Sequence, residues 1–302
     1  MRIKSNILTV VLAASTFFAL PQAHAGESQF GWIYTADLHP KGQSEIEQKF
    51  FLQHGQSQGQ YDYLQMQTEY ERGMSDNWQL ALYLNTSDIN AYRNGINGET
   101  SGPHVDPPQG FDTSKRFHTS KVETVSVESI WRLKNPVTDG YGLALYLEPE
   151  IGPHEREMEG KIILQKNFLD DRLIVAGNVT AQIEREKPPH THALERATML
   201  DLTAGVSYRF ANNWSAGLEA RNHNEYEGYG FGRQEHSAWF LGPNIHYAAK
   251  RWWVTAAWRQ QLPFVHAFNA EQRDVVVDHR IYGSEHTRNE FMLKLGFPLG
   301  SQ

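Results

Sequence analysis

The sequence of 302 residues contains no cysteine, which excludes disulfides, thiolate metal sites, a cysteine nucleophile and a lipoprotein anchor. Long apolar runs are missing after the N-terminus, and the mean hydropathy is −0.57. A bundle of membrane helices, in which each span needs about 20 apolar residues, is therefore excluded. The 28 Lys and Arg are outnumbered by 35 Asp and Glu, so the composition does not indicate a nucleic-acid-binding protein either.

The first 25 residues have the three parts of a secretory signal peptide. Arg2 and Lys4 make the start positive, residues 7–20 are apolar, and Ala23-His24-Ala25 fits a cleavage site. Residues 1–25 are therefore predicted to be removed, so that the exported chain begins at Gly26. The alternative, a permanent membrane anchor, is disfavoured because the apolar core is short for a membrane span.

The rest of the chain shows period-2 alternation of apolar and polar residues, the signature of β-strands, and no sustained helical period. Leu80, Leu82 and Leu84, for example, alternate with Ala81, Tyr83 and Asn85. Twelve such segments are predicted, at about 44–54, 61–72, 77–86, 121–133, 140–150, 160–168, 172–185, 197–210, 213–224, 236–247, 251–262 and 287–298.

Short and long connections alternate between these segments. Links after even-numbered segments are short, whereas most links after odd-numbered segments are longer and rich in Gly, Pro and His. This pattern is typical of a closed antiparallel transmembrane β-barrel, with short periplasmic turns and long extracellular loops. Closure also leaves no unpaired sheet edge in hydrocarbon. We therefore predict an all-β fold: a single barrel of about 12 strands over residues 44–302.

Aromatic side chains gather near the short turns, as expected for rings that lie where lipid chains meet headgroups. The alternative is a soluble β-sandwich or lipocalin-like barrel with these rings in its core, which alternation alone does not exclude. The signal peptide and the loop asymmetry favour the membrane barrel. The rings are Tyr70, Trp78, Trp131, Tyr141, Phe168, Tyr208, Phe210, Trp214, Tyr247, Trp252 and Trp253.

Polar residues that alternate with the apolar set are expected to line the lumen. Both charge signs occur, so no preference for anions or cations can be derived. Two interpretations remain open: a narrow polar pore for a small hydrophilic solute, or a barrel plugged by its own salt bridges. The predicted pore-lining residues are Glu45, Glu47, Lys49, Glu69, Glu128, Arg132, Glu148, Glu184, Arg209, Glu219, Arg221, Arg259 and Lys294.

The N-terminal segment 26–43 precedes the first predicted strand and is assigned to the periplasmic side. Phe30, Trp32 and Tyr34 alternate in it, and Pro40-Lys41-Gly42 turns the chain. The segment is expected either to add a strand or to lie at the periplasmic mouth of the barrel.

A search for catalytic motifs gives little. Ser237 follows His236, and His223 lies between two asparagines, but neither serine nor histidine has a nucleophile context such as G-x-S-x-G. The Gly-rich stretch 228–232 precedes no predicted helix, so a flexible loop is favoured over a phosphate site. We therefore predict no enzyme, no catalytic residues, no resident metal and no cofactor.

Histidines are concentrated in the predicted outer loops and at the outer rim. His190 and His192 have the i, i+2 spacing that puts two imidazoles on one face of an extended segment. One hypothesis is a mouth that responds to pH or holds Zn²⁺, Cu²⁺ or Ni²⁺; the favoured alternative is that these are ordinary polar loop residues. The eleven are His54, His104, His118, His154, His190, His192, His223, His236, His266, His279 and His286.

Residues 38–49, LHPKGQSEIEQK, resemble the opening of a functionally uncharacterised family of predicted proteobacterial outer-membrane β-barrel proteins. There a (D/L)-x-P-K-G-x-x-E-x-E-Q element leads into the first strand. The resemblance extends along the mature chain as strand rhythm; it implies a porin- or transporter-like barrel and transfers no catalytic residue. The ending departs from the usual pattern, because outer-membrane barrels commonly end on an aromatic residue and here Phe297 is followed by five further residues.

These observations predict a pore or transporter for small hydrophilic solutes in the outer membrane of a Gram-negative bacterium. The alternatives are a barrel enzyme that modifies lipid or lipopolysaccharide, with His223, His236 and Ser237 at its rim, and a structural or adhesive barrel. The expected partners are outer-membrane lipid and lipopolysaccharide, the outer-membrane assembly machinery and the solute; no nucleic-acid partner is expected.

Overall fold

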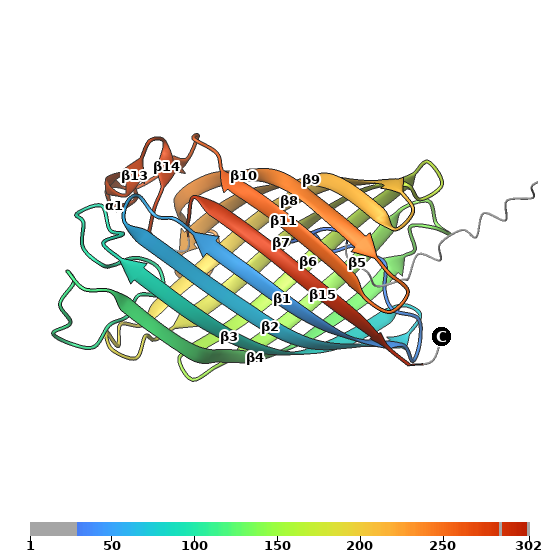
Figure 1. Ribbon diagram of the computed structural model, residues 1–302, viewed down its shortest axis with the longest axis horizontal. Helices are drawn as coiled ribbons and strands as arrows, with labels where there is room; N and C mark the ends of the chain where they lie inside the picture. The colour runs from blue at the N-terminus through green and yellow to red at the C-terminus, as the bar shows by residue number, and fades with distance from the viewer. Residues whose placement is uncertain (1–28, 284–285, 301–302) are drawn as a thin grey trace, which may run out of the picture.

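The computed structural model describes residues 29–283 and 286–300, and the predicted signal peptide lies outside them. The chain forms a barrel of twelve long antiparallel strands (Figure 1). The strands are β1 (Ser44–His54), β2 (Gln60–Ser75), β3 (Trp78–Tyr92), β4 (Phe117–Lys134), β5 (Gly142–Ile151), β6 (Glu155–Phe168), β7 (Leu173–Glu186), β8 (Glu195–Ala211), β9 (Trp214–Glu227), β10 (Arg233–Ala248), β11 (Trp253–Gln261) and β15 (Asn289–Leu299).

The barrel closes between its first and last long strands. Each strand pairs with its sequence neighbours, and β1 pairs with both β2 and β15, with Ser44 opposite Leu299 and His54 opposite Asn289. In the described chain, therefore, none of the twelve long strands is a free edge. The predicted strand number and closed antiparallel topology are confirmed.

The apolar residues of the alternating pattern point outward, and the polar ones point inward. On β3, Leu82 is 57% exposed whereas Tyr83 is 5% exposed. The same alternation holds along β5, where Leu145 and Leu147 are exposed and Ala144 and Tyr146 are buried. This arrangement suits a barrel whose outer face meets lipid.

Most of the aromatic residues near the short turns lie on the outer face, including Trp131, Trp214 and Trp252. Trp253 was wrongly assigned to this outer girdle, since it is fully buried inside the barrel. It follows Trp252 directly, and consecutive strand residues point to opposite faces. Its ring lies against Gly296, and its Nε1 donates a hydrogen bond to Glu45 Oε1 at 2.8 Å.

The links separate into two ends, as predicted, with one exception. The link between β5 and β6, expected at residues 151–159, spans only residues 152–154, because alternation continues through Glu155, Glu157 and Glu159. The longest link, between β11 and β15, carries β12 (His266–Ala267), the one-turn helix α1 (Ala270–Asp274), β13 (Val276–Val277) and β14 (Arg280–Ile281). No helix in the described part of the chain is both long and apolar enough to cross a membrane.

The segment 29–43 lies inside the barrel at its short-turn end and adds no strand to the sheet, so of the two expected arrangements only the added strand is excluded. Every long strand already has two partners, so no edge is available to a thirteenth strand. The segment instead crosses the lumen in its short-turn half, from Gly31 beside β9 to His39 beside β3. It thereby divides the interior into compartments.

Candidate functional site in the barrel lumen

Barrel side chains bind the backbone of the inner segment 29–43 much as a neighbouring strand would. Asn178 on β7 accepts from Tyr34 N at 2.8 Å and donates to Tyr34 O at 3.0 Å. Gln165 on β6 accepts from Ala36 N at 2.7 Å. Glu219 on β9 accepts from two consecutive backbone N–H groups of the segment at 2.6 and 3.0 Å. These bonds satisfy backbone groups that would otherwise be buried without partners.

Apolar contacts hold the same segment from its other side. Phe30 and Ile33 pack with Ile174 and Ala176 at the start of β7. Gly205 on β8 leaves the room for this contact, since a Cβ there would lie 2.6 Å from Ile33 Cδ1. Because fully burying one such side chain contributes about 1.5–3 kcal/mol, the segment is a docked part of the fold.

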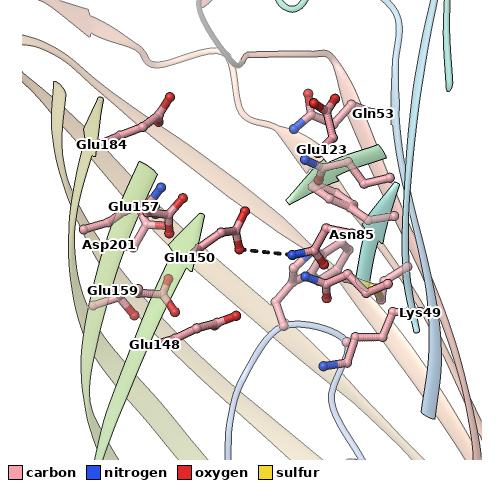
Figure 2. A pocket seen from close by; sticks show the side chains of 18 of the residues that line it. Lys49, Gln53, Asn85, Glu123, Glu148, Glu150, Glu157, Glu159, Glu184 and Asp201 are labelled. Atoms are coloured by element: carbon pink, nitrogen blue, oxygen red, sulfur yellow. Dashed lines mark hydrogen bonds between the residues drawn. The ribbon is translucent and has the colours of Figure 1, made fainter. Parts of the chain in front are cut away.

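A cavity of about 320 Å³ fills the lumen between the inner segment and the long-link end. Nine carboxylates and six Lys or Arg groups line it, an excess of three formal negative charges. Figure 2 shows most of the labelled acidic side chains on one wall and Glu123 on the opposite one, with Glu150 reaching across to Asn85 at 3.1 Å. The interior is thus charged and polar, which suits water.

The acidic wall is built by strand register. Across β5, β6 and β7, Glu148 is opposite Glu159, Glu150 is opposite Glu157, and Glu157 is opposite Glu184. Like charges directly opposite each other on neighbouring strands are destabilising. The fold therefore retains an arrangement that stability alone would not select.

The basic groups of the cavity are each paired with a carboxylate. Lys49 lies 2.7 Å from Glu69, Lys121 lies 3.0 Å from Glu123, and Arg221 lies 2.5 Å from Asp201. The other ion pairs are Lys161 with Glu159, Arg259 with Glu290 and Lys294 with Glu47. Within the described residues, by contrast, Glu148, Glu150 and Glu157 have no Lys or Arg at salt-bridge distance, so the uncompensated charge of this cavity is negative.

The open space inside the barrel is smaller beside the inner segment. A second cavity of about 40 Å³ lies between the segment and β1 to β4, and it shares Tyr34, Lys49 and Lys294 with the larger one. Lys49 Nζ lies 4.9 Å from the centroid of the Tyr83 ring and 5.8 Å from that of Tyr34. Tyr34, Lys49 and Lys294, which line both cavities, form the boundary between them.

All thirteen residues predicted to line a pore are buried or half-buried on inward positions. Five of them line neither cavity: Arg209 lies beside a short turn, Glu219 and Arg132 contact the inner segment, and Glu45 and Glu69 bind Trp253 and Lys49. Passage of a solute along these residues stays a prediction. Those that line the two cavities are Glu47, Lys49, Glu128, Glu148, Glu184, Arg221, Arg259 and Lys294.

The prediction missed four carboxylates of the acidic wall: Glu150, Glu155, Glu157 and Glu159. Three of them fall in the stretch 151–159 that was expected to be a loop. Their strict period of two was the signal that could have placed them on a strand.

The outer histidines divide into exposed residues and buried ones. His190 and His192 are exposed, and within the described residues they belong to no cluster of three or more ligand atoms. His104, in the link between β3 and β4, stacks on Tyr63 with ring centroids 4.0 Å apart. Burial lowers the pKa of His104 to about 4. His223, His236 and His286 are buried close together.

The residues proposed for a rim enzyme do not form a Ser/His pair. His236 is fully buried on the inward face of β10, and Ser237, the next residue, lies on the opposite face. There the Ser237 hydroxyl accepts from Asn222 Nδ2 at 3.0 Å.

Comparison with known families and structures identifies the group to which this barrel belongs. A model of a family of unknown function, DUF6662, matches residues 22–299. The chain belongs to this DUF6662 family. A search of curated proteins finds no significant match. The uncharacterised outer-membrane barrel family expected from residues 38–49 is thereby confirmed.

Solved outer-membrane proteins share the fold of this DUF6662 member. An outer membrane channel from Pseudomonas putida F1 superimposes with a TM-score of 0.58 at 8% identity, covering 86% of this chain and 96% of its own. The β domain of the Bordetella autotransporter BrkA gives 0.51 at 12%, covering 86% and 100%. The NanC porin gives 0.50 at 11%, covering 84% and 100%. At these identities the likeness shows the fold alone.

Proposed function

We propose that this DUF6662 barrel is a passive outer-membrane pore for small hydrophilic solutes, that it prefers cationic ones, and that its inner segment 29–43 sets the conductance. The support comes from the lumen: a charged cavity of about 320 Å³ adjoins a smaller polar cavity beside the segment, and the two share Tyr34, Lys49 and Lys294 as lining residues. Two of the structures with the same fold are a porin and an outer membrane channel.

The row of carboxylates directly opposite one another on β5, β6 and β7 carries the preference for cations. Glu150 and Glu157 stand at its centre and face each other in register. A passing cation with its hydration shell would offset the repulsion between these two carboxylates, whereas a passing anion would itself be repelled by both. The paired basic groups contribute less to the field that a solute meets, because a carboxylate lies beside each of them.

Conductance in planar bilayers tests this proposal. The purified barrel should give stepwise currents, and a KCl gradient across the bilayer should give a reversal potential of the sign expected for K⁺ passing faster than Cl⁻. Glu150→Gln combined with Glu157→Gln should shift that potential toward zero. Asp170→Asn, in an exposed turn, is the matched control and should leave it unchanged.

Two results would contradict the proposal. Correctly folded barrel that gives no currents and no swelling of liposomes in small sugars or amino acids is not a pore. Currents that favour Cl⁻, or a selectivity that the double variant leaves unchanged, would exclude the acidic wall as its cause.

A further inference from the structure

Three histidines from distant parts of the chain meet at one point of the barrel wall. His223 comes from β9, His236 from β10 and His286 from the link that precedes β15. One ring nitrogen of each lies within 4.8 Å of those of the other two. The ring centroids are 4.9 Å apart for His223 and His286, and 4.2 Å apart for His236 and His286.

These imidazoles are buried, and several of their ring nitrogens have no protein partner. The exposed fraction is 1% for His223, 0% for His236 and 1% for His286. Nδ1 of His236 and both ring nitrogens of His286 make no hydrogen bond to any described residue. A buried polar atom left without a partner costs about 1–3 kcal/mol, so each such atom in a native fold requires an explanation.

Carboxylates support two of the three rings from behind. Asp201 Oδ1 lies 2.6 Å from His223 Nδ1, and Glu225 Oε2 lies 2.8 Å from His236 Nε2. Histidines that bind metals almost always donate their second N–H to such a group, which fixes the tautomer and aims the other nitrogen at the ion. Glu225 thus leaves His236 Nδ1 as an acceptor, while His223 Nδ1 lies between Asp201 Oδ1 and the guanidinium of Arg221, whose Nη2 is 2.8 Å away.

We propose that His223, His236 and His286 form a binding site for one divalent transition-metal ion of the Zn²⁺ type. Imidazole nitrogen is a preferred ligand of Zn²⁺, Ni²⁺ and Cu²⁺. Around tetrahedral Zn²⁺ with bonds of about 2.0–2.1 Å, neighbouring nitrogens lie about 3.3 Å apart. Because the three nitrogens already lie within 4.8 Å of one another, small movements of the side chains suffice.

The site adjoins the lumen and ties the longest link to the wall. His223 and His286 also belong to the lining of the 320 Å³ cavity. His286 is held from the side of β1 as well, since Gln56 Nε2 donates to its carbonyl oxygen at 2.5 Å. Bound metal would thus fasten the link between β11 and β15 onto β9 and β10.

Metal titration of the folded barrel in detergent tests the site without requiring any transport. Co²⁺ serves as the spectroscopic probe and Zn²⁺ as its competitor. We expect one Co²⁺ per chain, with the visible absorption of a low-coordinate ion, displaced by one equivalent of Zn²⁺. His286→Ala, which changes a link residue, should weaken binding about 100-fold or more, since losing even a supporting carboxylate costs about 10–100-fold. Glu225→Gln should weaken it by that smaller factor.

Matched controls separate this site from other histidines. His279→Asn changes an exposed residue of the same link, and His190→Asn with His192→Asn changes the exposed pair; both variants should bind as the unchanged protein does. Faster migration of unboiled samples in gels checks that each variant is folded, and His286→Gln repeats the test if the alanine variant is not. Wild-type barrel that binds neither ion at micromolar concentration, or His286 variants that bind normally, would overturn the site, as would binding lost with His190 and His192.

Discussion

Freeing the inner segment 29–43 from the wall should open the barrel. The hydrogen bonds at the centre of the segment give the free energy by which its docking would weaken. Replacing Asn178 and Gln165 with alanine removes four bonds: two to the backbone of Tyr34, one to Ala36 N and one to the carboxylate of Asp37, at 2.7 to 3.0 Å. At about 1 kcal/mol for each bond, docking of the segment weakens by about 4 kcal/mol. Since each 1.4 kcal/mol is a factor of ten, the undocked population rises nearly a thousandfold.

Single-channel recording measures the consequence. The double variant Asn178→Ala/Gln165→Ala should show larger conductance steps or frequent visits to a larger open level. Gln182→Ala is the matched control, because Gln182 also points inward from β7 and lines the 320 Å³ cavity but is not one of the side chains that bind the inner segment. The chain has no cysteine, so Thr35→Cys introduces a single thiol in the segment. In the double variant that thiol should react faster with a bulky, water-soluble maleimide.

Equal conductance and equal labelling in the double variant and in the Gln182 control would refute this reasoning. The segment would then be held mainly by its apolar contacts, and the side-chain hydrogen bonds would contribute little. A variant that labels faster but conducts as before would show that the segment leaves the wall without limiting the current.

Three further predictions concern the wall and the loops. Leu145→Arg should lower the free energy of unfolding in lipid vesicles by about 2–4 kcal/mol if Leu145 faces lipid at mid-depth. The control Leu169→Arg, in an exposed turn, should change this free energy little. No loss of stability in Leu145→Arg would mean that the inward and outward faces of the strand are reversed. Gly296→Ala should cost about 1–3 kcal/mol, because its Cβ would lie 2.1 Å from the Trp253 ring, and Gly160→Ala, with 3.9 Å of space, should be neutral in the same assay. The pKa of His104 is about 4 in the folded protein and 6.5 when unfolded, so the folded loop keeps its full stability above pH 6.5. This stability is lost as the pH falls toward 4, because the unfolded chain binds the proton more readily. At pH 5 the loss is about 2 kcal/mol, so proteolysis of residues 93–116 should speed up on acidification in the wild type but not in His104→Gln.

The strands could be predicted because alternation is a local property. Most of the strands bury one set of side chains and expose the other along much of their length, so the sequence of Leu80 to Asn85 already contains the two faces of β3. Closure followed from counting strands and from the rhythm of the links. Trp253 was misplaced because the general preference of Trp for the membrane interface was applied without considering strand alternation. Alternation puts Trp253 on the inward face when Trp252 faces outward.

The inner segment and the histidine cluster could not be predicted in the same way, since both depend on contacts between residues far apart in the chain. Phe30, Trp32 and Tyr34 alternate as a strand would, but only the closed sheet shows that no edge is free to pair with them. The one available signal was the pair of uncharged amides, Gln165 and Asn178, at inward positions near the short turns. Amides can both donate and accept, as a strand backbone does.

Charge in the lumen illustrates the same limit and carries the strongest functional argument. Read along the sequence, the inward residues mix both signs; placed in register, the basic groups are paired while Glu150 and Glu157 face each other on adjacent strands. Such repulsion between neighbouring strands opposes folding, so a barrel selected only for stability would place at least one basic residue there. The positions opposite or next to this pair in register are occupied by Glu148, Glu159 and Glu184, and none of them is basic. A role in attracting cations accounts for that choice, and the reversal potential of the Glu150→Gln/Glu157→Gln variant measures it directly.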